Sequence, residues 1–177
     1  MNKPSKLISP VGPLIKILIT CIFCGGFIGA STNAINGYVS PQYYQNILGW
    51  EFTSIWSASI AQGIFEGLIY GILFSLIFTI SLLVIWKGQA PYSLALTHIL
   101  KTVLVVYICW TLGGLIAMGL AALSPEFYRA AFYKVPTETK QMLRYAWVGG
   151  SIWGALLGGF IGVIVAIVWV NTGYKSL

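Results

Sequence analysis

Four long apolar stretches dominate the 177-residue chain and restrict what it can fold into. They cover about residues 14–35, 56–86, 94–123 and 147–170. A helix needs about 20 mostly apolar residues to cross the hydrocarbon core of a bilayer, and each stretch reaches that length. The apolar runs are continuous, whereas the strands of a membrane barrel alternate apolar and polar residues. The sequence therefore predicts an all-α integral membrane protein, with four transmembrane helices in a single domain over residues 1–177.

Charged residues are scarce, which agrees with this architecture. Only 8% of the residues are charged, against about 25% in an ordinary soluble domain. A soluble surface or a disordered chain needs far more polar residues, so both classes are excluded. The net charge of +6 is carried mainly in loops and near helix ends, so it does not indicate a nucleic-acid partner. The predicted partner is the lipid bilayer.

The distribution of basic residues predicts how the chain is oriented. Loops on the cytoplasmic side of a membrane carry an excess of Lys and Arg. Six basic residues lie on the side of the termini: Lys3, Lys6, Lys16, Lys87, Lys101 and Lys175. Four lie on the opposite side, all in the second loop there: Arg129, Lys134, Lys140 and Arg144. Both termini are therefore predicted to be cytoplasmic.

The first apolar stretch is expected to be a retained helix. It is longer than the roughly 7–15 apolar residues of a removable signal peptide. The sequence shows no evident retention or cleavage motif, which favours a bacterial plasma (inner) membrane.

Two similar halves, about residues 10–86 and 94–170, predict a tandem repeat of one helical hairpin. Their loops share a Ser-Pro-x-aromatic pattern, which predicts a Ser-capped short helix at the membrane surface that makes external contacts. The matching loop residues are Ser40, Pro41 and Tyr43 in the first half, and Ser124, Pro125 and Phe127 in the second. After the loops, a second set matches at constant spacing: Trp56, Gly63, Gly67 and Gly71 with Trp147, Gly154, Gly158 and Gly162. Both hairpins then insert in the same orientation.

Small residues recur every fourth position on the second and fourth helices. The two stripes are Ser59, Gly63, Gly67, Gly71, Ser75 and Thr79, and Ala146, Gly150, Gly154, Gly158, Gly162 and Ala166. Small residues at this spacing let membrane helices approach closely. We expect the stripes to serve internal packing of these two helices, with packing against another chain as the alternative.

Glu66 is the only carboxylate well inside a predicted span. It lies about 15 Å along the helix axis from Trp56, and it flanks Gly63 and Gly67. An ionisable group inside a membrane is a candidate functional site. Gln62 lies one turn away, and Asn33 and Asn36 reach a similar depth from the first helix. These four residues form a candidate ion or proton site, with a neutral structural hydrogen-bond network as the alternative.

Residues typical of enzyme sites are missing from the sequence. There is one His, no Asp, and no phosphate-binding or zinc-protease motif. Cys21 and Cys24 lie mid-span with no Cys in the external loops, so we interpret them as small packing residues. The prediction includes no catalytic residue, cofactor or metal, although a membrane enzyme is kept as a minor alternative.

The sequence predicts a non-catalytic membrane subunit or scaffold that acts through helix–helix contacts. It would assemble as a homo-oligomer or within a larger membrane complex. The alternative is a small transporter or channel for a proton or ion that uses Glu66.

Replacing Gly67 or Gly158 with Leu should disrupt folding or assembly, because each side chain would enter a close helix contact. Particle size and thermal stability after detergent extraction measure this effect. Unchanged size and stability in both variants would contradict a packing role for the stripes.

Overall fold

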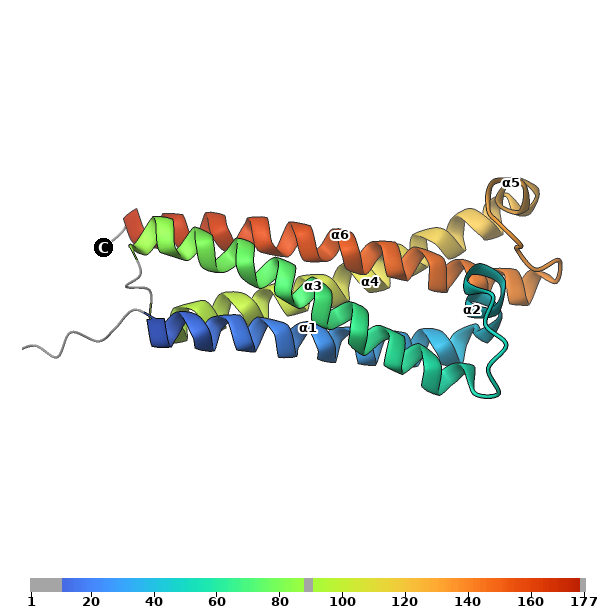
Figure 1. Cartoon of the computed structure of the whole chain (residues 1–177). Coiled ribbons are helices and arrows are strands. Elements are labelled where there is room, and N and C mark those ends of the chain that lie inside the picture. Colours follow the sequence, from blue (N-terminus) through green and yellow to red (C-terminus); the bar gives the residue numbers. More distant parts are fainter. Residues whose placement is uncertain (1–10, 88–90, 176–177) are drawn as a thin grey trace, which may run out of the picture.

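The computed structural model describes residues 11–87 and 91–175, and these residues form six helices (Figure 1). The helices are α1 (Val11–Val39), α2 (Pro41–Leu48), α3 (Ile55–Trp86), α4 (Tyr92–Leu123), α5 (Pro125–Ala131) and α6 (Thr139–Lys175). Four of them, α1, α3, α4 and α6, are long and apolar enough to cross a membrane. The prediction of an all-α protein with four membrane helices is confirmed at this level. Lys3 and Lys6, which contributed to the predicted orientation, lie outside the described residues.

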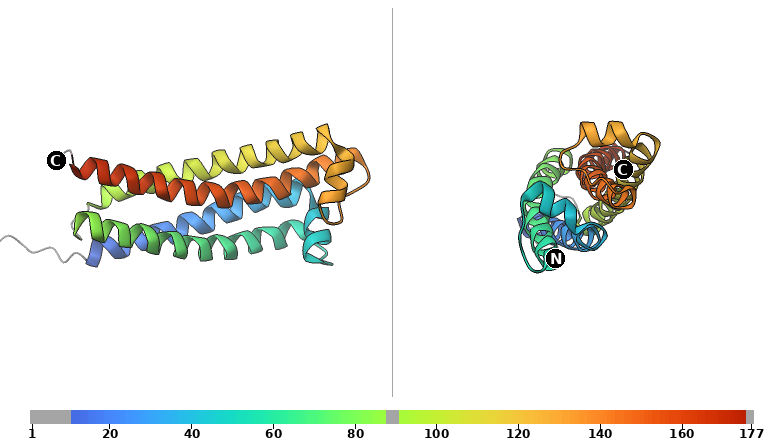
Figure 2. Two further views of the ribbon diagram at one scale, coloured as in Figure 1. Left: turned by 90° about the horizontal axis from the view of Figure 1, so that it is seen from above. Right: turned by 90° about the vertical axis from the view of Figure 1, so that its right-hand side faces the viewer.

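The four long helices run side by side, with the two short helices together at one end (Figures 1 and 2). We call this end, which carries α2 and α5, the loop end. The opposite end, where α1 begins and α6 ends, we call the terminal end. Helix α1 pairs with α3 and α4 pairs with α6, and far fewer contacts cross between the two pairs. The chain is thus organised as two hairpin-like units.

Glycine allows direct backbone contact between α1 and α3. A Cβ atom added at Gly29 would collide with the carbonyl oxygen of Gly63, and one added at Gly63 would collide with that of Gly29. One turn along, Gly25 and Gly67 exclude each other's Cβ in the same way. In a bilayer, where apolar burial does not drive helices together, such close packing supplies much of the attraction. Each glycine stripe therefore packs within its own hairpin.

The α4·α6 pair has contacts of the same kind. Gly113 contacts Gly150 and Gly154, as Gly29 contacts Gly63 and Gly67. Gly25 contacts Gly67 and Gly71 in the same manner, so these contacts are compatible with more than one register. A four-residue periodicity looks the same after a shift of one turn, so the sequence pattern does not determine the register.

Helix α6 begins at Thr139, about two turns before the predicted start near Trp147. Its first turns carry Thr139, Lys140 and Arg144, whose polarity lowers the local hydropathy without preventing a helix. The other long helices begin or end within four residues of their predicted bounds.

Short helices follow both Ser-Pro motifs, as predicted, but the expected Ser caps are wrong. Ser40 and Ser124 occupy the N-cap positions of α2 and α5, and neither side chain makes a capping hydrogen bond. The backbone N–H of Ser40 donates to the carbonyl oxygen of Asn36 (3.0 Å), and that of Ser124 to Leu120 (3.0 Å). Each Ser therefore closes the preceding helix, and the next helix starts directly at Pro41 or Pro125.

Replacing Gly63 with Ala should destabilise the protein by about 2 kcal/mol, because the added methyl group collides with backbone that cannot move freely. The matched control is Gly119→Ala on α4, where an added Cβ meets no atom within 4 Å. The control should be neutral or stabilising, since Ala favours a helix over Gly by about 1 kcal/mol. Thermal unfolding in detergent measures both. Equal melting temperatures for the two variants would contradict the close backbone contact.

Candidate functional site

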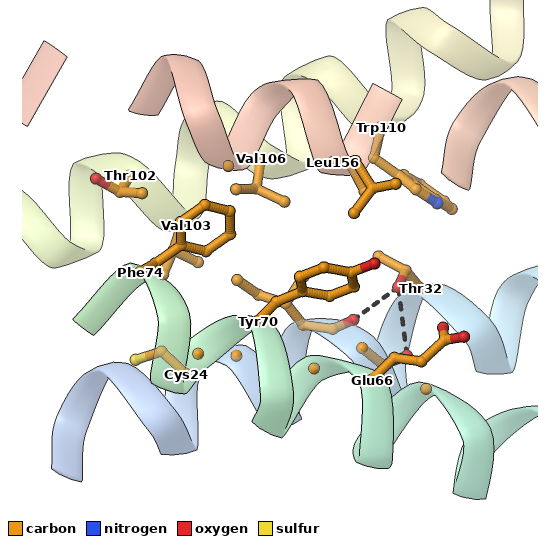
Figure 3. A pocket seen from close by; sticks show the side chains of 18 of the residues that line it. Cys24, Thr32, Glu66, Tyr70, Phe74, Thr102, Val103, Val106, Trp110 and Leu156 are labelled. Atoms are coloured by element: carbon orange, nitrogen blue, oxygen red, sulfur yellow. Dashed lines mark hydrogen bonds between the residues drawn. The ribbon is translucent and has the colours of Figure 1, made fainter. Parts of the chain in front are cut away.

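A cavity of about 200 Å³ lies between the two hairpins and is lined by all four long helices (Figure 3). Most of its lining is apolar, with polar side chains contributed mainly by α1 and α3. Because each hairpin is tightly packed internally, the space falls between them rather than inside either one. The cavity is the main feature that hydropathy patterns could not predict.

Buried side-chain clusters lie at both ends of the cavity. At the terminal end, Phe78 and Ile99 line the cavity and belong to a core cluster that includes residues from all four long helices. At the loop end, Tyr44 of α2 packs with Ile55 of α3 and Val148 of α6. Helix α2 therefore joins the two hairpins at the loop end.

Glu66 lines the cavity from α3, as do Asn33 and Asn36 from α1. Gln62 does not line it, but its Nε2 donates a hydrogen bond of 2.6 Å to Glu66 Oε1. Thr32 also faces this region, and its hydroxyl donates to the carbonyl oxygen of Ile28 (2.8 Å) (Figure 3). The four residues of the predicted ion or proton site thus lie in one region, towards the loop end.

The buried hydroxyl of Tyr44 fixes Asn33. The Tyr44 hydroxyl donates a 3.1 Å hydrogen bond to Asn33 Oδ1, and Tyr44 is only 2% exposed. Ser59 Oγ donates to the backbone carbonyl oxygen of Asn33 at 3.0 Å. These bonds connect α1, α2 and α3 next to the cavity.

Asn36 has a polar atom without a partner. Its side chain is fully buried (0% exposed) and lines the cavity, and its Oδ1 accepts a 3.1 Å hydrogen bond from Ser151 Oγ of the other hairpin. Its Nδ2 has no hydrogen-bond partner among the described residues. A buried donor without a partner typically costs about 1–3 kcal/mol. The Ser151 hydroxyl also lies within hydrogen-bond distance (3.0 Å) of the carbonyl oxygen of Val148, so Asn36 belongs to a buried polar group that joins α1 to α6.

Aromatic side chains form part of the cavity wall. Tyr70 and Phe74 extend from α3 towards the other hairpin, and Trp110 extends from α4 (Figure 3). The Phe74 ring meets that of Phe160 edge to face at a centroid distance of 5.3 Å. The Trp110 ring meets that of Trp147 in the same way, also at 5.3 Å.

The negative charge of Glu66 also acts on α2. Burial, and after it the charge of Glu66, raises the pKa of the Tyr43 hydroxyl. The same two causes, with a smaller effect of Tyr43, raise the pKa of Tyr44. Both phenols therefore stay neutral over the physiological range, and Tyr44 keeps the proton that it donates to Asn33.

The other predicted site residues lie in different surroundings. Gly63, Gly67 and Gly71 line the cavity as well as packing on α1. The second stripe, Gly150, Gly154, Gly158 and Gly162, packs on α4. Among the loop residues, Ser40 is buried and Tyr43 packs on Tyr44 and Tyr145, while Pro41, Ser124 and Phe127 are exposed and Pro125 is half-buried. The predicted external contacts thus include both buried and exposed side chains.

Comparison of the chain with profiles of known protein families, with characterised proteins and with solved structures gives no significant match. Interpretation of the site therefore depends on its own geometry.

Sequence reasoning missed Tyr44, Tyr70 and Ser151. Tyr44 belongs to a loop motif that was interpreted as surface, and its burial depends on α2 folding back over the bundle. Ser151 follows Gly150 in a small-residue stripe, which gives no sign that its hydroxyl reaches Asn36 on another helix.

Replacing Tyr44 with Phe should destabilise the protein by about 1–3 kcal/mol, because it leaves the buried oxygen of Asn33 without its donor. The matched control is Tyr38→Phe, which removes a hydroxyl from a side chain that is 81% exposed. Differential scanning fluorimetry in detergent compares the two. A similar change in melting temperature for both would contradict the role of the Tyr44–Asn33 bond.

Proposed function

We propose that this protein is a small membrane transporter for a proton or a cation, in which Glu66 carries or binds the transported species. The observation that carries this proposal is the position of Glu66. The carboxylate lines a cavity bounded by both hairpins, and the buried side chain of Asn36 belongs to the same lining. A membrane-embedded carboxylate placed at such a cavity is typical of substrate and proton pathways.

The difference between packing within and between hairpins supports this proposal. Within each hairpin, backbone lies against backbone, which makes a stiff unit. Between hairpins, the contacts are side chains, such as the hydrogen bonds of Ser31 with Tyr107 (2.6 Å) and Thr20 with Tyr92 (2.9 Å). Transporters commonly move one bundle against another around a central site. Two stiff hairpins around a cavity suit such a motion.

The size of the cavity supports a binding role. A space of about 200 Å³ lies between the hairpins, and larger apolar side chains on α4 or α6 would fill it. A site that accepts a ligand explains the space better than packing does.

In the proposed orientation, both termini are cytoplasmic and the loop end faces away from the cytoplasm of a bacterial plasma membrane. The positive-inside distribution supports this orientation. The two hairpins would be repeats of one unit that insert in parallel, related by a pseudo-twofold axis along the membrane normal. The matched glycine contacts of Gly29 and Gly113 support the repeat.

A second candidate is a non-catalytic subunit or scaffold, alone as a homo-oligomer or in a larger membrane complex. The large exposed side chains around α5, Leu123, Phe127 and Tyr133, favour it as a contact surface. Both glycine stripes, however, are already used within the chain. The scaffold would therefore depend on the loop-end surface alone. Neither candidate assigns an enzymatic step to the chain.

Purified protein in liposomes should conduct protons or monovalent cations down an imposed gradient, and Glu66→Gln should reduce this flux at least tenfold. The matched control is Glu51→Gln, which neutralises an exposed loop carboxylate and should leave the flux unchanged. A pH-sensitive dye inside the liposomes and a cation-selective electrode outside measure the two kinds of flux.

Equal flux in the two variants would contradict a transport role for Glu66. Absence of flux in the wild-type protein, together with stable co-purification of another membrane protein, would support the subunit instead.

A further inference from the structure

The chemistry of the cavity wall narrows the class of ligand, given the proposed function. Glu66 supplies the only acidic side chain of the lining, and no lining residue is basic. Lys101, the basic residue furthest inside a described span, places its Nζ 4.5 Å from the ring centroid of Trp169 instead. No described residue of the lining therefore supplies a cation to Glu66.

A metal ion fits this cavity poorly. Hard cations such as Ca²⁺ take about six to eight oxygen ligands. No group of three or more His, Cys, Asp or Glu side chains lies together in the described part of the chain. The side-chain oxygens of the lining are spread over α1, α3 and α4 and include a single carboxylate, that of Glu66. Most of the remaining wall is apolar.

An organic cation needs no such set of ligands, because its charge is spread over carbon-bound groups. Aromatic faces attract ammonium groups, and quaternary ammonium ions are commonly bound in aromatic surroundings. Tyr70, Phe74 and Trp110 provide aromatic rings on the cavity wall, and Glu66 provides the opposite charge (Figure 3). The apolar wall towards Phe78 suits the carbon part of such a ligand.

The size of the cavity limits the ligand. The volume of about 200 Å³ is below the roughly 300 Å³ at which pockets for drug-sized ligands begin, so the ligand is small, on the order of ten non-hydrogen atoms.

We infer that the cavity binds a small organic ammonium ion. The ammonium group lies against Glu66 and the aromatic rings. This inference rests on the proposed transport function for its site, and it replaces a bare proton or inorganic ion with a defined class of molecule.

The test uses the detergent-solubilised full chain and acetylcholine as a probe, because it is a small quaternary ammonium ion. Equilibrium dialysis with the labelled probe should show saturable binding at one site per chain. Glu66→Gln should weaken it at least thirtyfold, since the charged partner of the ammonium ion is lost. Tyr70→Leu should weaken it by up to about tenfold, and Glu51→Gln should leave it unchanged.

A neutral ligand of the same shape tests the charge without altering the protein. In 3,3-dimethylbutyl acetate, carbon replaces the ammonium nitrogen, and this compound should fail to displace labelled acetylcholine from the wild-type protein. Effective displacement by the neutral ester would overturn the inference, as would absence of saturable acetylcholine binding.

These outcomes are separate from those of the transport experiment. Proton or inorganic-cation flux that depends on Glu66, without acetylcholine binding, would overturn the ligand class and leave the transport proposal intact. Acetylcholine binding that depends on Glu66, in a protein without flux of any cation, would support the ligand class and overturn transport.

Discussion

The contact of backbone with backbone inside each hairpin is the interaction on which the rest of the structure depends. In a bilayer, apolar side chains gain little from leaving lipid for protein, so helices associate where atoms pack at short range. Gly29 and Gly63 allow α1 and α3 to reach that distance, and Gly113 and Gly150 do so for α4 and α6. Each hairpin is thus held together along its own length, and the space between the hairpins is left to side chains.

Those side chains divide the interior into two chemical regions. Towards the terminal end, Phe78 and Ile99 belong to an apolar core that includes all four long helices. Towards the loop end, Asn33, Asn36 and Glu66 line the cavity, and Tyr44 donates a hydrogen bond to Asn33. The short helix α2 thus contacts this polar region.

Hydropathy was sufficient to predict four long apolar helices. It also drew attention to Glu66, Asn33 and Asn36 as polar residues in or near predicted spans, and all three line the cavity. The glycine register could not be determined, since a four-residue repeat is unchanged by a shift of one turn. Tyr44 and Ser151 were missed because their roles depend on which helices become neighbours. The start of α6 was predicted too late because its first turns are polar. Hydropathy indicates which residues suit a membrane core, and it does not show where a helix begins.

The use of glycine inside the hairpins and side chains between them has a consequence for how such a protein can change. Substitutions at Tyr70 or Phe74 alter the cavity wall without touching the glycine contacts that hold each hairpin together. The fold can therefore tolerate many different cavity linings. A scaffold of this kind can acquire new ligand preferences through single substitutions or through redesign in the laboratory. Its architecture meanwhile depends on a few glycines, which have no side chain.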